Sequence, residues 1–510
     1  MAFKIPEKIE FYPEIDRVVS TESGRLRGIP GNAPQFTVFR GIPYAKPPVG
    51  ELRWKEPQPA EAWEGIRDAS RFGPMGLQER QCRGSLYGDE FFRSSEPMSE
   101  DCLYLNIWTP SVTHDEKLPV LFWIHGGALT SGFGHEPEFD GEAFCKEGVI
   151  LVTINYRLGI LGFYANPELS AESPHHVSGN YGHLDQIAAL HWVKRNIENF
   201  GGDPDKITIA GQSAGAFSVQ FLLTSPLSKN DIAGAVIMSS ASVSKLSAIM
   251  RPVLMEDAEK AGAEMVKDAG CANVNELRRL SYEELKAIPG AGWGGKYMFS
   301  SVIDHYSLER SPSESYFQNE YPDIPMMIGN TVGEGQMFFG TSMDVDQWKK
   351  QQEAVFGPYA DRYFELAAVQ GPEDLARVAR ESHSAMMQNR VLCELNVKNG
   401  HKPCYLYLFD RDLPGDDAGS FHSSELWYVF GTLYRCWRPM TGVDYDISRQ
   451  MVKSWANFTK VQNPNSDGVP EWKAYDPAEP YNMVFGENTG CRPMEETPLQ
   501  KFLKETALAM

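Results

Sequence analysis

The chain has 510 residues and a formal net charge of −20, with 42% hydrophobic and 12% aromatic residues. This composition is typical of a globular protein with a large core, and such an acidic surface repels nucleic-acid phosphates and anionic lipid headgroups. No segment reaches the roughly 18 apolar residues of a membrane span, and residues 1–20 hold no apolar run long enough for a signal peptide. We therefore expect a cytoplasmic protein that has no membrane span and binds no nucleic acid.

The first hundred residues are expected to form short strands and loops. Within them, residues 36–42 lead into Pro43, Pro47 and Pro48, which forbid a helix at that place. Apolar runs of strand length follow, at 103–108, 120–124, 150–155, 207–210, 233–238, 325–329 and 404–409. Residues 181–199 carry apolar side chains at helical spacing between two of these runs. Strand, helix and strand in succession indicate a parallel sheet.

Two later stretches, at about 245–316 and 345–397, are polar and mostly helical in pattern, and 447–461 predicts a final amphipathic helix. The sequence therefore predicts the α/β class, with a large, mostly parallel central sheet flanked by helices. We expect residues 1–510 to form one domain, in which the two helical stretches are cap insertions.

A G-x-S-x-G motif, from Gly211 to Gly215, lies between a predicted strand and a predicted helix. A sharp turn from strand to helix forces Ser213 into a strained conformation and exposes its hydroxyl at the edge of the sheet. The N–H of Ala214 then lies at the start of the helix, where it favours an oxyanion. A glycine-rich turn with an incidental serine is the alternative, and the strand and helix context argues against it.

The strand at 120–124 ends in His125 and two glycines, followed by Ala128. Glycines after a strand leave main-chain N–H groups free to bind the negative oxygen of a tetrahedral intermediate, and each such donor lowers the barrier by about 3 to 4 kcal/mol. We do not assign His125 as the general base, because it lies beside these glycines and more plausibly fixes the loop.

A nucleophilic serine needs an imidazole base and a carboxylate that orients the base. His422 lies in a loop after the predicted strand at 404–409, and Glu334 lies between glycines after the strand at 325–329. The order of serine, acid and histidine is that of α/β-hydrolases. The weaker candidates are His305, His383 and His401 for the base and Asp304 and Asp323 for the acid.

Five further segments, at 39–54, 99–106, 155–163, 179–186 and 199–204, resemble the type-B carboxylesterase family. The resemblance extends from about residue 24 to residue 472. It implies an α/β-hydrolase fold and a serine carboxylesterase that needs no metal or cofactor. Carried over to this chain, it implies the following site residues: Ser213 as nucleophile, Glu334 as acid, His422 as base, and Gly127, Ala128 and Ala214 as oxyanion donors.

The resemblance also implies that Ser239 supports the triad, that Arg53 and Glu100 form a structural ion pair, and that Cys102 pairs with Cys82. The residues themselves favour free thiols, because a disulfide requires an oxidising compartment.

The sequence departs from the family pattern at four positions. Ala128 replaces a common glycine, and Gln212 stands where cholinesterases carry a glutamate. Gly333 replaces an aspartate, and Ser423 replaces a glycine. The change at Gln212 argues against choline esters.

We expect a small-molecule ester as the partner and a monomer or homodimer as the assembly. One alternative is an aryl or cinnamoyl (feruloyl-type) esterase with the same chemistry. Aromatic side chains that could line its pocket, or could equally be core, are Phe133, Phe338, Phe339, Phe421 and Trp427. A second alternative is a non-catalytic binding protein on the same fold, which the presence of all three triad residues disfavours.

Overall fold

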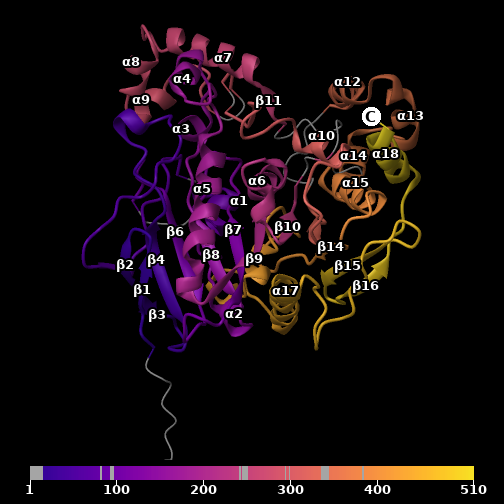
Figure 1. Ribbon diagram of the computed structural model, residues 1–510. Helices are drawn as coiled ribbons and strands as arrows, with labels where there is room; N and C mark the ends of the chain where they lie inside the picture. Colours follow the sequence, from indigo (N-terminus) through magenta and orange to yellow (C-terminus); the bar gives the residue numbers. More distant parts are fainter. Residues whose placement is uncertain are drawn as a thin grey trace, which may run out of the picture.

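An 11-stranded sheet runs through the centre of the molecule (Figure 1). A computed structural model describes residues 15–80, 83–91, 97–240, 243, 251–292, 295–297, 299–334, 344–381 and 384–509. The order of strands in the sheet is β16-β15-β14-β13-β10-β9-β7-β8-β6-β4-β3. Their bounds are β3 Ile29–Pro30, β4 Thr37–Pro43, β6 Tyr104–Thr109, β7 Leu118–Ile124, β8 Ile150–Ile154, β9 Gly202–Gln212, β10 Gly234–Met238, β13 Met326–Thr331, β14 Cys404–Asp410, β15 Tyr481–Gly486 and β16 Gly490–Pro493.

The middle of the sheet is parallel, from β8 through β7, β9, β10, β13 and β14 to β15. The outer strands on both sides pair antiparallel. The predicted, mostly parallel sheet is therefore present. Two small sheets lie outside it, formed by β1 (Val18–Thr21), β2 (Gly24–Arg27) and β5 (Ile66–Asp68), and by β11 (Val253–Leu254) and β12 (Val302–Ile303).

Alternating side chains of the strands face two separate cores. In β7, Val120, Phe122 and Ile124 pack in the core that contains α5 (Tyr181–Asn196) and α6 (Ala214–Thr224). Leu121 and Trp123 point to the other core, with α2 (Glu142–Lys146), α16 (Leu426–Val429) and α17 (Gly442–Val461). Because successive strand residues point to opposite faces, a continuous apolar run fits a strand that is covered on both sides.

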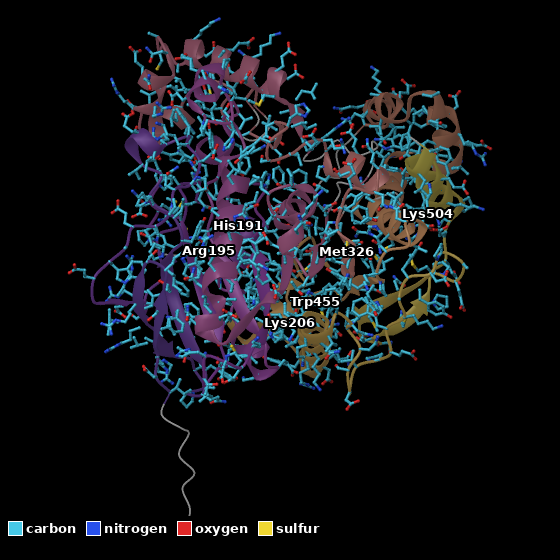
Figure 2. All side chains as sticks on the ribbon, viewed as in Figure 1. His191, Arg195, Lys206, Met326, Trp455 and Lys504 are labelled. Carbon is cyan, nitrogen blue, oxygen red and sulfur yellow. The ribbon has the colours of Figure 1, made fainter. Side chains whose placement is uncertain are left out.

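The side chains that fill these layers are drawn in Figure 2, where Trp455 of α17 and Met326 of β13 are labelled. Both are fully buried. The remaining helices are α1 Leu86–Glu90, α3 Gly159–Phe163, α4 Pro167–Glu172, α7 Met255–Asp268, α8 Val274–Arg278, α9 Tyr282–Lys286, α10 Pro312–Phe317, α12 Val345–Phe356, α13 Ala360–Ala367, α14 Pro372–Glu381, α15 Ser384–Lys398 and α18 Pro498–Ala509. The 3₁₀ helices are η1 Gly50–Leu52, η2 Ile197–Phe200, η3 Lys229–Asp231, η4 Gly357–Tyr359 and η5 Leu433–Arg435.

Both stretches that the sequence predicts to be helical contain helices. Helices α7, α8 and α9 lie together with α3 and α4 at the upper left of Figure 1, and α12 to α15 lie at the upper right with α18. Met265, Leu277 and Leu285 anchor the first group through a core of its own. Leu499 and Leu503 of α18 pack in the core of the second group.

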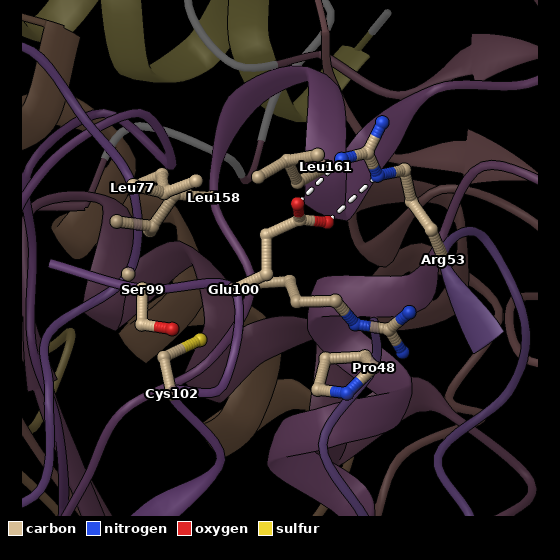
Figure 3. Close-up of a pocket in the computed structure, with 10 residues that line it drawn as sticks. Pro48, Arg53, Leu77, Ser99, Glu100, Cys102, Leu158 and Leu161 are labelled. Atoms are coloured by element: carbon tan, nitrogen blue, oxygen red, sulfur yellow. Dashed lines mark hydrogen bonds and ion pairs between the residues drawn. The ribbon is translucent and has the colours of Figure 1, made fainter. Parts of the chain in front are cut away.

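Arg53 joins the N-terminal part of the chain to the first helical group. Its Nε donates to Glu100 Oε2 over 2.7 Å, and its Nη1 donates to the carbonyl oxygen of Arg278 over 2.6 Å. Figure 3 shows the two guanidinium contacts with Glu100 at the edge of a small pocket, which Ser99 and Cys102 also line. The ion pair implied by the resemblance is therefore present and nearly buried.

Several expectations need correction or lie outside the described residues. Strand β9 begins five residues earlier than the apolar run at 207–210 indicates, because its polar start at Gly202 pairs with Leu118 of β7. The C-terminal β15, β16 and α18 have no counterpart in the sequence prediction. Cys102 is a free, buried thiol, whereas Cys82 lies outside the described residues.

In the part of the chain that the structure describes, no helix combines the length and the apolar character needed to cross a membrane.

Candidate active site

Ser213 forms the turn between β9 and α6. Its φ is 57° and its ψ is −125°, a conformation that costs a non-glycine residue on the order of 1 to 3 kcal/mol. The turn is held on both sides, because Ser213 N donates to Met238 O over 2.9 Å and Ser213 O accepts from Phe217 N over 3.0 Å. Ser213 is partly exposed, whereas the residues beside it are buried.

Gly215 allows this turn to approach the neighbouring strand. A Cβ atom at Gly215 would lie 2.1 Å from the carbonyl oxygen of Ile124, the last residue of β7. The glycine therefore lets the start of α6 pack against the loop that follows β7. The two segments with predicted oxyanion donors are adjacent for this steric reason.

The loop after β7 has the backbone expected of an anion-binding turn. Gly127 has a φ of 95° and Ala128 a φ of 57°. The Gly127 carbonyl accepts from the N–H groups of Thr130 and Ser131, at 3.0 and 2.9 Å. Within the described residues, the N–H groups of Gly127 and Ala128 donate to no protein acceptor. These two donors, both partly exposed, are available to a ligand.

His422 and Glu334 form an ion pair between two neighbouring strand ends. Glu334 follows β13, and its Oε1 accepts from Thr331 N over 3.1 Å. Its Oε2 binds Nδ1 of His422, which lies in the loop after β14. Burial alone would lower the pKa of His422, but the adjacent carboxylate outweighs burial and the pKa is raised. A neutral imidazole with its hydrogen on Nδ1 can accept a proton at Nε2.

The weaker candidates lie in other settings. Asp304 accepts bonds from the N–H groups of a tight turn at 306–308, and Asp323 accepts from Lys402 N. The side chain of His305 is 70% exposed beside Glu309, and His401 packs against Tyr321. His383 lies outside the described residues.

His125 is fully buried and stacks on Tyr156 with ring centroids 4.4 Å apart. Its Nδ1 lies 2.9 Å from the Gly126 carbonyl, and burial lowers its pKa to about 4. These contacts fit a neutral residue that fixes the loop.

Ser239 bonds a second buried glutamate, which the sequence analysis did not identify. The Ser239 hydroxyl lies 3.5 Å from Oε1 of Glu425, three residues after His422. Glu425 is fully buried, and burial together with Glu334 raises its pKa to about 8. Glu425 is therefore a neutral carboxyl group at pH 7. The close spacing to His422 is the only sequence signal that could have indicated it.

Tyr87 is a second residue that the sequence analysis missed. It lies on α1, and its hydroxyl donates to the main-chain oxygen of His422 over 2.9 Å. The same helix ends at Glu90, which accepts bonds from Trp427, Trp437 and Arg438. Helix α1 thus holds the His422 loop and the segment after it. No local pattern around Tyr87 indicates this role.

The aromatic side chains proposed as a pocket lining are buried in the described part of the chain. Phe421 packs near Tyr87 and Phe91, and Trp427 stacks on Phe91 with centroids 5.7 Å apart. Phe133 is 2% exposed. The core alternative therefore fits these three, and Phe338 and Phe339 lie outside the described residues.

Among the described residues, no group of three or more His, Cys, Asp or Glu side chains is placed to hold a metal ion. The chemical resources of the site are a strained hydroxyl, an imidazole paired with a carboxylate, and open N–H donors. This combination fits acyl transfer.

Comparisons with known proteins identify the family of this chain. The sequence model of the carboxylesterase family matches residues 15–396 and 381–506. A fumonisin B1 esterase from Sphingopyxis macrogoltabida is 34% identical over 92% of this chain and 86% of its own length. Liver carboxylesterase 1 of Oryctolagus cuniculus is 34% identical over 95% of this chain and 92% of its own.

Solved structures give the same result. A PNB esterase has a TM-score of 0.82 and 30% identity, covering 96% of this chain and 99% of that chain. A carboxylesterase of Geobacillus stearothermophilus has a TM-score of 0.78 and 33% identity, covering 96% and 100%.

Proposed function

Because this chain belongs to the carboxylesterase family and is a carboxylic ester hydrolase with the α/β-hydrolase fold, we propose that Ser213, His422 and Glu334 are its catalytic triad. The observation that carries the proposal is the buried pair of His422 Nδ1 and Glu334 Oε2 at the strand ends next to the strained serine turn. Gly127, Ala128 and Ala214 supply the oxyanion donors.

The reaction proceeds by two acyl transfers. The Ser213 hydroxyl attacks the ester carbonyl carbon while His422 Nε2 takes its proton. The negative oxygen that forms is bound by the N–H groups of Gly127, Ala128 and Ala214. The imidazolium then protonates the leaving alcohol, and the acyl group remains on Ser213.

Water completes the cycle. His422 takes a proton from the water that attacks the acyl-enzyme, and then returns a proton to Ser213 as the carboxylic acid leaves. Glu334 keeps the imidazole in the tautomer with hydrogen on Nδ1 and stabilises the imidazolium. Every proton in this scheme moves between the protein, the ester and water.

The test uses Ser213→Ala and hydrolysis of para-nitrophenyl butyrate. We expect kcat to fall by roughly 10⁴- to 10⁶-fold, with loss of covalent labelling by a fluorophosphonate. The labelled wild-type peptide should contain Ser213. Wild-type turnover by the alanine variant would refute the nucleophile, and absence of labelling and turnover in the wild type would favour the non-catalytic binding protein.

The substrate is a small ester. We infer from the burial of Phe133, Phe421 and Trp427 that these side chains do not select aromatic acyl groups. A panel of esters that differ in acyl length and aromaticity tests this inference, since a strong preference for cinnamoyl esters would favour the feruloyl-type alternative.

We also infer that the helical groups at 255–317 and 345–398 belong to one catalytic domain with the sheet. Supporting contacts are the bond from Arg53 to the Arg278 carbonyl and the packing of α15 on β13 and β14. A single cooperative unfolding transition is expected, and two separated transitions would contradict the inference.

A further inference from the structure

The side chain of Gln212 connects three parts of the site. Gln212 is the last residue of β9, directly before Ser213, and is 2% exposed. Its Oε1 accepts a hydrogen bond of 3.0 Å from the Ser423 hydroxyl. Its Nε2 lies 3.3 Å from Nε2 and 3.5 Å from Nδ1 of His422. The same Oε1 packs against Gly126, 3.4 Å from where a Cβ atom would be.

Ser423 is itself in an unusual conformation. Its φ of 77° lies in the left-handed region, which favours glycine because it has no Cβ atom. The serine is 6% exposed, and in this position its hydroxyl reaches Gln212. A glycine would adopt the same backbone without strain but would lose this bond. The hydroxyl, and not the backbone, therefore accounts for a serine at this position.

The bond from Ser423 determines which end of the Gln212 amide faces the base. Since Oε1 accepts the Ser423 proton, the NH₂ group points to the imidazole. The NH₂ group lies at nearly the same distance from both ring nitrogens, so it lies over the ring and not in the plane of the Nε2 lone pair. Its N–H hydrogens carry partial positive charge, which disfavours an imidazolium relative to a neutral imidazole. In this orientation the amide favours the unprotonated base.

Other groups around His422 act in the opposite direction. Glu334 binds Nδ1, and its carboxylate favours a protonated imidazole. Glu425, in the same loop, adds to this effect only where it is ionised. Tyr87 donates to the main-chain oxygen of His422, and its hydroxyl also lies beside the Ser423 hydroxyl. Gln212 is therefore the uncharged group whose NH₂ counteracts the Glu334 carboxylate beside the base.

We propose that Gln212 and Ser423 form a positioning pair, in which the serine hydroxyl fixes the amide so that its NH₂ group faces His422 and extends ester hydrolysis to lower pH. The proposal rests on the proposed function, because it requires His422 to be the general base. It assigns Gln212 and Ser423 a joint role that neither residue has alone.

The test is the pH dependence of kcat/KM for para-nitrophenyl acetate, followed as acid release at constant pH. The low-pH limb reports the base of the free enzyme. In Gln212→Glu a carboxylate replaces the amide beside the imidazole, and we expect the midpoint of this limb to rise by about one pH unit or more. In this variant, the value of kcat/KM on the high-pH plateau should change far less than the value at pH 6.

Ser423→Gly is the second variant, and it removes the hydroxyl while relieving the backbone strain. We expect the midpoint of the low-pH limb to rise by less than in Gln212→Glu, because the amide remains but is no longer held in one orientation. In the double variant the shift caused by Ser423→Gly should differ from its value alone, since the two residues act through one bond. Gln318→Glu adds the same charge at an exposed position and should leave the limb unmoved.

Coinciding low-pH limbs for the wild type and Gln212→Glu, or strictly additive shifts in the double variant, would overturn the proposal. If Gln212→Glu fails to fold, an unshifted limb in Ser423→Gly would overturn it equally. Failure of the triad is a separate result, since it would appear as retained turnover in His422→Asn. Loss of turnover in His422→Asn together with unshifted limbs would therefore reject only the positioning pair.

Discussion

The hydroxyl of Tyr87 donates a hydrogen bond of 2.9 Å to the main-chain oxygen of His422, across 335 positions of the sequence. The bond fixes the backbone of the proposed base. Helix α1 is held in turn through Glu90 by Trp427 and Arg438, which follow the base in the chain. A segment near the N-terminus thus determines where the base lies.

Tyr87→Phe removes this bond without leaving a cavity. We expect kcat to fall by roughly 3- to 10-fold, in line with the loss of a bond worth about 1 kcal/mol, while KM stays nearly constant. Steady-state kinetics with para-nitrophenyl butyrate give both constants. Tyr434→Phe, at a residue that is 60% exposed, is the matched control. An equal effect in both variants would exclude a specific role for Tyr87.

Glu334→Gln keeps the shape of the side chain but removes the charge that holds the imidazole. We expect kcat to fall by roughly 10³- to 10⁴-fold, because the tautomer and the imidazolium both lose support. Labelling of Ser213 by a fluorophosphonate should slow in parallel. A variant that retains a tenth of wild-type activity would show that another group orients His422.

Glu425→Gln is the same change in the neighbouring carboxyl group, and here the expected effect is on stability. The pKa of Glu425 is raised from 4.5 to about 8 by burial and by Glu334. Between these two values the folded protein holds a proton that the unfolded chain has lost. This group therefore makes the free energy of unfolding decrease as pH rises from 4.5 to 8, and it adds no further change above 8.

The glutamine variant cannot titrate, so its free energy of unfolding should fall less steeply with pH in this range. The slopes of the wild type and the variant should differ by about 1.4 kcal/mol per pH unit. Urea denaturation at several pH values between 5 and 8 measures both slopes. Parallel slopes for the two proteins would mean that Glu425 is ionised in the folded state. Activity at pH 7 should change much less than in Glu334→Gln, because the wild-type group is already neutral there.

Arg438→Met tests the buried ionic network behind the base loop. The side chain of Arg438 has no exposed surface and pairs with Glu90 and Asp416. Its removal leaves Glu90 charged and buried, so we expect a loss of about 3 to 5 kcal/mol in the free energy of unfolding.

Adding Glu90→Gln to Arg438→Met should restore part of this loss. Arg449→Met, which breaks an ion pair with Asp446 that is mostly exposed, should cost less than about 1 kcal/mol. Equal losses of unfolding free energy in Arg438→Met and Arg449→Met would show that burial does not set the cost of breaking these ion pairs.

The sequence predicted the parts of the fold and site that depend on local pattern. The apolar runs became β7, β8 and β10, because strands covered on both faces are apolar throughout. The turn at Ser213 follows from the steric demands on Gly215, which are also local. The proximity of His422 and Glu334 could be expected because neighbouring parallel strands end at the same edge.

Other features depend on contacts between distant segments. Tyr87 and Glu425 act through bonds to residues that no periodicity places beside them. The polar start of β9 becomes a strand only because β7 supplies a partner. The bond from Ser423 to Gln212 joins two departures from the family pattern that are 211 positions apart, and only the folded chain shows that they are related.

The guanidinium of Arg53 binds Glu100 and a carbonyl of the first helical group, 225 residues further along. A replacement for that group of helices must therefore supply a matching acceptor, because without one a buried guanidinium N–H loses its hydrogen-bond partner. Chimeras between related enzymes should accordingly keep the two segments together, with both crossover points outside them.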